Sequence, residues 1–283
     1  QLCVSCKACR RECPTGVDMA RMKVEVTALR TEAEGLSFHD WLIAYLPRYA
    51  PYMAGMAPVI RLRDIIPGAA WLSEKLTGFT ARRPLPRWQR KWFRDNELPQ
   101  TPNKGVISTT EKPPLLLFID SFNRYFEPEN LRAAIRVFRA TGYDVFVPPP
   151  PDSGRPLCCG RTYLSTGLID LAREEAGRLA ATLAPFARAG IPIVGLEPSC
   201  TLALRDEIPA LLNNQDSKDV ALATLTFEEL LARDKPSLSL KSNKSKALLH
   251  GHCHQKAFDA VKPIEEVLSW IEGLEVEKIE TSC

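Results

Sequence analysis

Four cysteines near the start of the chain constrain it more than any other feature. Cys3, Cys6, Cys9 and Cys13 are spaced C-x2-C-x2-C-x3-C, and Pro14 follows directly. Three thiolates on so tight a loop bind one face of a cubane [4Fe–4S] cluster, and in two-cluster ferredoxins the fourth, before proline, ligates a different cluster. Structural zinc sites usually take two separated cysteine pairs, so the spacing favours iron–sulfur over zinc or unpaired loop thiols.

The same motif predicts a neighbouring segment that this sequence does not contain. Cys13 needs a second cysteine run with which to share a cluster, and the cluster on Cys3, Cys6 and Cys9 needs a fourth ligand. The sequence begins at Gln1 without an initiator Met or a secretory signal. We therefore expect an upstream run of the same kind just before Gln1.

Composition is that of an ordinary globular protein. The 283 residues are 45% hydrophobic and 25% charged, and a formal net charge of +3 is too small to suggest a nucleic-acid partner. No apolar run approaches the roughly 18 to 20 residues of a membrane-spanning helix, so membrane contact, if any, is expected to be peripheral. The 9 cysteines lie in metal-type clusters, which favours a reducing, cytoplasmic compartment over a disulfide framework.

The first two of three expected parts are helical. Residues 1–35 hold the cysteine run and a helix, as in a ferredoxin-like fragment, and residues 36–113 predict a proline-interrupted helical connector and linker. Within the connector, Trp88, Trp92 and Phe93 are interleaved with basic residues. That segment suits an anionic membrane surface or a partner subunit, unless its aromatic side chains pack on the neighbouring domain.

The third part, residues 114–283, predicts an α/β domain. Expected strands alternate with expected helices, which implies a mostly parallel sheet with ligands at the carboxyl ends of its strands. The strands are expected at 115–120, 143–147, 191–196, 246–250 and 274–279, and the helices at 129–141, 167–189, 202–212 and 263–271.

The α/β part contains an internal repeat. Residues 115–127 align with residues 247–259, and the alignment puts Ser121 opposite Cys253. We therefore expect a duplicated unit, with unit one at 114–213 and an incomplete unit two at 246–283.

Several phrases resemble the cysteine-rich "CCG" domain of heterodisulfide reductases and of the iron–sulfur portion of FAD-linked D-2-hydroxyacid dehydrogenases, of the D-lactate, D-2-hydroxyglutarate or glycolate oxidase type. They are the run at 3–14, the segment 118–129, Cys-Cys-Gly-Arg at 158–161, Gly-Leu-Glu-Pro-Ser-Cys at 195–200, and His-Gly-His-Cys-His-Gln-Lys at 250–256. The resemblance implies that a second Cys-Cys-Gly begins at about Cys283, so that the domain is truncated at both ends.

The chain departs from the family where five thiolates are expected. Unit one offers Ser121, Cys158, Cys159, Glu197 and Cys200, so a five-thiolate non-cubane cluster cannot form there. Three thiolates with a histidine or carboxylate would suit zinc or a second, site-differentiated iron–sulfur cluster. The repeat would bring further candidate metal ligands close to them, namely His252, Cys253, His254 and Cys283.

These candidates have plainer interpretations as well. Cys158 and Cys159 would also suit buried structural thiols. If the strand before Cys253 continued that far, alternation would send His252 and His254 to one side and Cys253 to the other. No catalytic residue is identified from the sequence.

The resemblance implies a Rossmann-like α/β domain behind a ferredoxin-like fragment, and a function in electron transfer. The hydride would go to FAD on a separate domain or subunit, because the chain has no G-x-G-x-x-G fingerprint. Electrons would then pass through [4Fe–4S] clusters to a quinone or another acceptor, with peripheral association at the inner face of the membrane. A heterodisulfide-reductase-like redox subunit and a zinc-stabilised docking scaffold are the alternatives.

Overall fold

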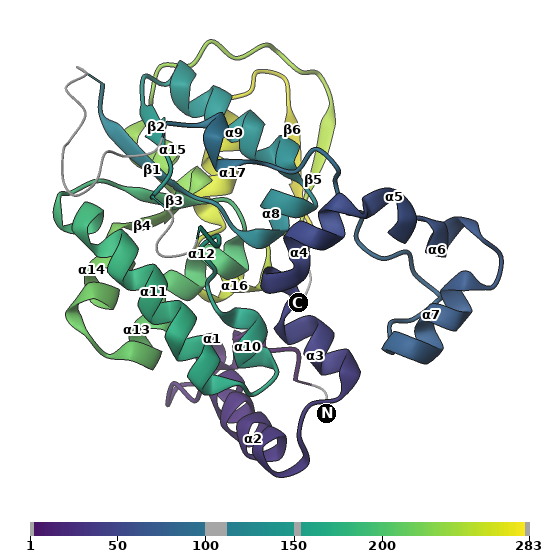
Figure 1. Ribbon diagram of the computed structural model, residues 1–283. Coiled ribbons are helices and arrows are strands. Elements are labelled where there is room, and N and C mark those ends of the chain that lie inside the picture. The colour runs from purple at the N-terminus through teal and green to yellow at the C-terminus, as the bar shows by residue number, and fades with distance from the viewer. Residues whose placement is uncertain (1–2, 100–111, 150–153, 281–283) are drawn as a thin grey trace.

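The computed structural model describes residues 3–99, 112–149 and 154–280. They form an α/β body, with a helical N-terminal part packed along one side of it (Figure 1). The α/β class and the parallel sheet expected from the sequence are confirmed.

The main sheet has four parallel strands in the order β2-β1-β3-β4. The middle of β1 aligns with both neighbours, because Leu116 pairs with Phe146 on one side and with Ile193 on the other. The strands are β1 (Pro114–Phe118), β2 (Asp144–Phe146), β3 (Ile193–Gly195) and β4 (Thr224–Thr226).

Helices cover both faces of this sheet, as Figure 1 shows. The helices of this body are α8 (Ser121–Tyr125), α9 (Pro128–Ala140), α10 (Arg161–Ser165), α11 (Ile169–Arg188), α12 (Pro198–Arg205), α13 (Glu207–Leu212), α14 (Gln215–Ala223) and α15 (Phe227–Asp234), of which α9 and α15 pack on one face and α11, α12 and α14 on the other. The helix expected at 202–212 is therefore broken at Asp206, which joins α12 to α13.

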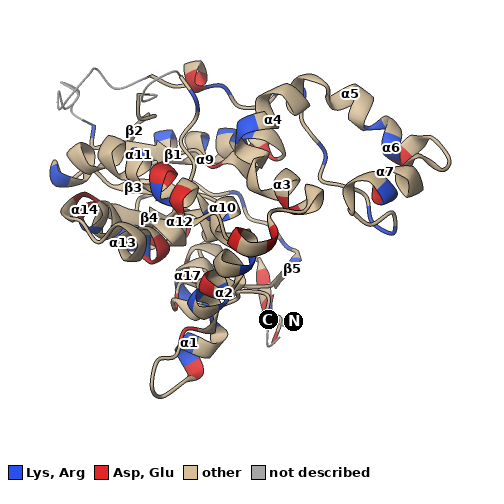
Figure 2. Cartoon of the chain, turned by 60° about the horizontal axis from the view of Figure 1, so that its bottom comes forward, with Lys and Arg blue, Asp and Glu red and all other residues tan. Residues whose placement is uncertain are grey.

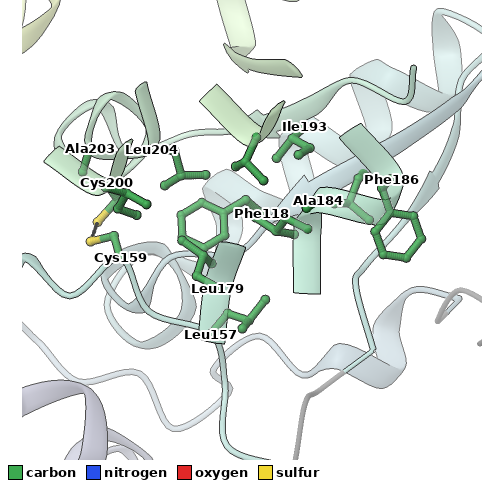
Figure 3. Packing of buried hydrophobic residues seen from close by; sticks show 14 of the residues in the cluster. Phe118, Leu157, Cys159, Leu179, Ala184, Phe186, Ile193, Cys200, Ala203 and Leu204 are labelled. Carbon is green, nitrogen blue, oxygen red and sulfur yellow. Dashed lines mark hydrogen bonds between the residues drawn. The ribbon is translucent and has the colours of Figure 1, made fainter. Parts of the chain in front are cut away.

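Side chains of β1 alternate between two hydrophobic cores, as the pleat of a strand requires. Leu115 and Leu117 pack on one face with α9 and α15. Leu116 and Phe118 pack on the other face with α11, α12 and α14, and Figure 3 shows Phe118 at the centre of that core. Both faces of β1 are buried, which is why its sequence is continuously apolar.

A second, two-stranded sheet lies near the C-terminus. β5 (Lys246–Leu249) and β6 (Glu275–Lys278) pair in parallel, and α16 (Cys253–Ala257) and α17 (Lys262–Ser269) connect them. This order of strand, short helix, helix and strand matches β1, α8, α9 and β2. Ser121 and Cys253, which the sequence alignment puts opposite each other, are the first residues of the two short helices.

The N-terminal part is a succession of helices. They are α1 (Ala8–Glu12), α2 (Met19–Glu34), α3 (Phe38–Ala44), α4 (Leu46–Gly55), α5 (Ala57–Ile60), α6 (Leu62–Ile65) and α7 (Ala69–Thr77), followed by the 3-10 turn η1 (Asp95–Glu97). Asp18 caps α2 by accepting hydrogen bonds from the backbone N–H groups of Ala20 and Arg21.

Helix α2 docks on the turn between α10 and α11. The Thr31 hydroxyl donates a hydrogen bond to the carbonyl of Thr166 at 2.8 Å. The next residue, Gly167, has a φ of +80°, and a Cβ there would lie 2.6 Å from the carbonyl oxygen of Thr27. Only glycine permits so close an approach of the two backbones.

Helices α5–α7 form an arm that projects from the body (Figure 1). Most of its ribbon is tan in Figure 2, and it exposes a set of large apolar side chains, namely Val59, Leu62, Ile65, Ile66, Trp71, Leu72 and Leu76. By contrast, the aromatic residues of the basic segment pack inward, since Phe93 is fully buried and the Trp88 ring lies 4.3 Å from that of Phe126. Within the described ranges, no helix is long and apolar enough to cross a bilayer.

Candidate functional site

A cavity of about 250 Å³ lies at the carboxyl ends of β1 and β3. The chain runs from β1 outward to β2 and returns to the opposite side of β1 as β3, so the strand order reverses there. Such switch points are where parallel α/β sheets bind ligands. The lining comes from the loops after these strands, from the segment around α10 and from the connector, and comprises Ile43, Leu46, Pro47, Asp120, Ser121, Phe122, Cys158, Cys159, Arg161, Thr162, Ser165, Ser199 and Cys200.

Three buried thiols gather at this cavity. The sulfurs of Cys159 and Cys200 are 3.3 Å apart and point toward each other in Figure 3. Hydrogen bonds from the thiols of Cys158 and then Cys200 lower the pKa of Cys159 well below its ordinary value. The same contacts to Cys159, with burial, raise the pKa of Cys158 and of Cys200. Cys159 therefore loses its proton more readily than either neighbouring thiol.

Gly160 sets the position of the adjacent cysteine pair. Its φ is +77°, and a Cβ would lie 3.1 Å from the carbonyl oxygen of Ala172 in α11. The Gly160 N–H also contacts the sulfur of Cys158 at 3.4 Å. The glycine in the Cys-Cys-Gly phrase is thus required for the turn that presents both thiols.

Two carboxyl side chains follow the same two strands. Asp120 caps α8 by accepting hydrogen bonds from the backbone and side-chain nitrogens of Asn123, each at 2.8 Å. Burial raises the pKa of Asp120 to about 6, and the charge of Glu197 adds to this rise. Glu197 caps α12 and accepts a hydrogen bond from the Ser199 hydroxyl at 2.6 Å.

Arg161 connects the cavity to helix α16. Its Nη1 donates to Nε2 of His254 at 2.8 Å and lies 3.3 Å from a carboxylate oxygen of Glu207. The ring of His252 stacks on that of His254, and Nδ1 of His252 accepts the His254 backbone N–H. The strand therefore does not continue to His252, which is the N-cap of a helix that begins at Cys253.

His254 is expected to make stability depend on pH. Burial, then the nearby Arg161 guanidinium, lowers the pKa of His254 to about 3. The unfolded chain protonates near the ordinary value of about 6.5, so the free energy of unfolding falls as the pH drops below that value. Urea unfolding at about pH 7 and about pH 5 should show a loss that is about 1–2 kcal/mol smaller for His254→Gln than for the unmodified protein. Equal losses in the two proteins would contradict this assignment.

The N-terminal cysteine run is seated on the α/β body by a buried ion cluster. Lys7, between Cys6 and Cys9, is 2% exposed, and its ammonium contacts the carboxylate of Asp206 and lies 2.9 Å from that of Glu207. Asp206 also pairs with Arg10 at 2.5 Å and with Arg21 at 2.7 Å. Burial alone would raise the pKa of Asp206, but Lys7 and then Arg10 outweigh burial and lower it. A single carboxylate thus anchors three cations of the N-terminal part.

Left-handed residues shape the cysteine loop itself. Ser5 has a φ of +58° and Lys7 a φ of +62°, so the chain turns sharply between successive cysteines. Cys9 lies in α1, and Cys13 ends it, with its sulfur 3.1 Å from the Thr15 hydroxyl. That hydrogen bond lowers the pKa of Cys13.

The structure brings some predicted residues together and separates others. Ser121, Cys158, Cys159 and Cys200 share the cavity, whereas His254 reaches it only through Arg161. No three His, Cys, Asp or Glu side chains in the described segments are arranged to hold a metal ion. Cys283 lies outside the described residues.

Sequence reasoning missed four residues of this region. Asp120 could have been found, since it follows a buried strand at the expected ligand end. Arg161 belongs to the Cys-Cys-Gly-Arg phrase but had no assigned role. Lys7 and Asp206 gave no signal, because their pairing joins positions separated by 199 in the sequence.

Comparisons with known proteins find dehydrogenases, or a part of one, among the proteins that are similar to this chain. The chain is 26% identical to the C subunit of the anaerobic glycerol-3-phosphate dehydrogenase of Escherichia coli K12, over 94% of this chain and 64% of that protein. It is 25% identical to the D-2-hydroxyglutarate dehydrogenase of Pseudomonas putida over 90% of this chain and 25% of that protein. The corresponding Escherichia coli K12 enzyme is 23% identical over 89% of this chain and 24% of its own length.

The chain therefore spans less than two thirds of the glycerol-3-phosphate relative and about a quarter of each hydroxyglutarate relative. No family model and no solved structure matches it. The relatives are dehydrogenases or a part of one, which confirms the resemblance to D-2-hydroxyglutarate dehydrogenases found in the sequence.

Proposed function

We propose that this chain is the iron–sulfur electron-transfer portion of an FAD-linked dehydrogenase that oxidises a CH–OH group. One observation carries the proposal: the ion cluster around Asp206 seats the N-terminal cysteine run against the end of α12, the helix that also bears Cys200. Two cysteine sites far apart in the sequence thereby lie at the two ends of one short helix. Such an arrangement suits stepwise electron transfer between them.

The spacing of the N-terminal cysteines, not the geometry of their side chains, supports a [4Fe–4S] cluster. Cys3, Cys6 and Cys9 stand on a loop turned by left-handed residues, and their side chains are partly or fully exposed, which leaves the thiols accessible to iron. A bound cluster would supply reversible one-electron transfer. Cys13, at the end of α1, would serve a second cluster shared with a neighbouring run. Lys7 would hold the loop in place from its buried side.

The thiols at the cavity are candidates for a second metal site. Cys158, Cys159 and Cys200 are a donor set that suits zinc or a site-differentiated iron–sulfur cluster. The lowered pKa of Cys159 favours the thiolate form that a metal ligand requires. His252, Cys253 and His254, one helix away, remain candidate ligands under the repeat hypothesis.

Flavin and substrate would be bound outside this chain. The 64% coverage of a relative that is itself one subunit of a dehydrogenase supports partner subunits, one of which would carry FAD. The arm α5–α7, with exposed apolar side chains and the exposed Arg61, would make peripheral contact with a membrane surface. The electron acceptor would then be a membrane quinone or another acceptor.

The test is metal and sulfide analysis with EPR on protein purified anaerobically with its flavoprotein partner. We expect this protein to contain iron and acid-labile sulfide. We also expect cubane EPR signals to appear when the hydroxyl substrate is added. Changing Cys3, Cys6 and Cys9 to Ser should remove the N-terminal signal and slow acceptor reduction at least 100-fold, while flavin reduction persists. Val4→Ser, a change at a 71% exposed position in the same loop, is the matched control and should leave both unchanged.

Other outcomes select the alternatives. Acceptor reduction at the normal rate without the three cysteines would overturn the relay. Stoichiometric zinc without labile sulfide would support the docking scaffold, in which the metal contributes only folding energy. A non-cubane EPR signal would support disulfide-reductase chemistry at the cavity.

A further inference from the structure

We propose that Cys159 and Cys200 form a reversible disulfide bond when peroxide enters the cavity at the ends of β1 and β3, and that this bond excludes a metal from the same sulfurs. The bond goes beyond the proposed electron-transfer function, because it needs only the thiols of the metal-free chain. Its effect on a metal rests on the candidate metal site of that function, and the two parts are tested separately.

The two sulfurs are already close to bonding distance. They are 3.3 Å apart and point toward each other (Figure 3). A disulfide bond is about 2.05 Å long, so the sulfurs need to approach by about 1.2 Å, shared between two side chains. Rotation of the side chains can supply a movement of this size without a change in the sheet.

Separate elements of the fold hold the two thiols in place. Gly160, whose φ is +77°, fixes the turn that carries Cys159. Cys200 lies in the first turn of α12, which the side chain of Glu197 caps. Both cysteines pack in the same hydrophobic core. The sulfurs therefore meet because of the fold, although 41 positions separate the two residues in the sequence.

Cys158 is a less suitable partner for Cys159. Adjacent residues have Cα atoms about 3.8 Å apart across a trans peptide bond. Disulfides usually join Cα atoms that are about 4.4–6.8 Å apart, so a bond between the two neighbours would be strained. The Cys158 sulfur also contacts the backbone N–H of Gly160 at 3.4 Å, within its own turn. Cys200 is therefore the expected partner.

The cavity gives a small oxidant access to the pair. Cys159 is 5% exposed and Cys200 is 4% exposed, so neither thiol is open to a bulky reagent at the surface. Both line the cavity of about 250 Å³, which has room for a molecule as small as hydrogen peroxide. The pair therefore differs from buried thiols that are sealed in a core and are inert.

The oxidation balances in two steps. One thiol of the pair attacks hydrogen peroxide, which breaks the O–O bond and yields a sulfenic acid and one water molecule. The second thiol attacks the sulfenic sulfur, which forms the S–S bond and releases a second water molecule. The two sulfurs together lose two electrons and two protons, and peroxide is reduced to water. A thiol reductant reverses the bond by exchange.

The bond would remove two of the three sulfurs of the candidate metal site. Metals bind cysteine as the thiolate, and a disulfide sulfur is no thiolate. Cys158 would be left as the single thiol of the set. A metal that holds Cys159 and Cys200 would in turn keep the two sulfurs from reacting. The pair would thus accept a metal under reducing conditions and close under oxidising ones.

The bond is tested by peptide mapping of the full chain. The protein is reduced, freed of metal with a chelator and treated with hydrogen peroxide, and its remaining thiols are alkylated before digestion with trypsin. We expect the tryptic peptides 140–161 and 189–205 to be joined with the loss of two hydrogen atoms. Fragmentation should place the alkyl group on Cys158, and dithiothreitol should separate the peptides. Absence of the joined peptides, or an alkyl group on Cys159, would overturn the pairing.

Two serine variants test which neighbour takes part. Cys158→Ser should still give the joined peptides at the rate of the unmodified protein. Cys159→Ser removes the sulfur that faces Cys200 and should form them at least tenfold more slowly. Melting temperatures confirm that both variants fold. Equal rates in the two variants would contradict the assignment to Cys159.

The exclusion of a metal is tested with zinc, which has no redox chemistry of its own. Saturating the reduced chain with zinc before peroxide is added should slow the joining of the peptides at least tenfold. Peroxide-treated chain should bind one zinc ion fewer than reduced chain, and dithiothreitol should restore it. Equal rates with and without zinc would overturn the switch. Neither result depends on the N-terminal cluster, whose EPR signals test the proposed function separately.

Discussion

Asp206→Asn is expected to lower the free energy of unfolding by about 3–5 kcal/mol, the range for removing one partner of a buried ion pair. The Asp206 carboxylate is 4% exposed and Lys7 is 2% exposed, so the variant leaves an ammonium buried without its closest countercharge. Arg10 and Arg21 lose the same partner. Denaturant unfolding measures the loss, and proteolysis should become faster within α1 and α2, which the carboxylate anchors.

Two companion variants identify the cause. Asp170→Asn breaks an ion pair with Arg173 in which Asp170 is 97% exposed, and a change of less than about 1 kcal/mol is expected. Lys7→Met in the Asp206→Asn background removes the stranded charge and should restore part of the stability. A loss of the same size for Asp170 and Asp206 would show that the cluster is not the anchor.

The Asp206 carboxylate also predicts how the free energy of unfolding changes at acid pH. The pKa of Asp206 is lowered in the folded protein, so its contribution is present above the ordinary aspartate pKa and is lost as the pH falls through the lowered value. Asp206→Asn should therefore flatten the acid side of the stability curve.

Gly167→Ala is expected to be the most damaging alanine substitution among the left-handed glycines. A Cβ would lie 2.6 Å from the carbonyl oxygen of Thr27 and 2.8 Å from the backbone of Ala28, so α2 must move away. The hydrogen bond from Thr31 to Thr166 would be lost with it. We expect a loss of about 3 kcal/mol or more, since strain in the left-handed region alone costs roughly 1–2 kcal/mol.

Gly142→Ala separates the strain of a left-handed backbone from the steric clash with α2. Gly142 has a φ of +88° after α9, but a Cβ there would meet nothing within 4 Å. Its substitution should therefore show only the conformational strain. Measured by denaturant unfolding, equal losses at Gly142 and Gly167 would mean that α2 is not held by the close backbone contact.

The α/β class could be predicted because each long helix or buried strand has a recognisable hydrophobic pattern of its own. The apolar run at β1 and the amphipathic pattern of α9 and α11 reflect the two buried faces of the sheet. The cavity could be placed in outline as well, since Ser121 and Cys200 follow strands. These signals are local, so a single sequence carries them.

What could not be predicted depends on contacts between distant segments. Strand β4 is Thr-Leu-Thr between α14 and α15, with no apolar run to mark it, and it adds to the sheet through its pairing with β3. The helix expected at 202–212 breaks at Asp206, which places this carboxylate beside Lys7, a pairing that no local pattern predicts. The connector wall of the cavity, at Ile43 and Leu46, likewise becomes visible only when α3 and α4 pack on the body.

The separation of Lys7 and Asp206 also sets an order of events during protein synthesis. Their pairing spans 199 positions, so at about 5–20 residues per second the ribosome needs on the order of 10–40 s to produce the anchor after the cysteine run has been made. Throughout that interval, Cys3, Cys6 and Cys9 lie on a segment that has not yet docked on the α/β body. Under the proposed function, a cluster would thus be built on an accessible nascent chain, and translation of the second half would then fix it beside α12.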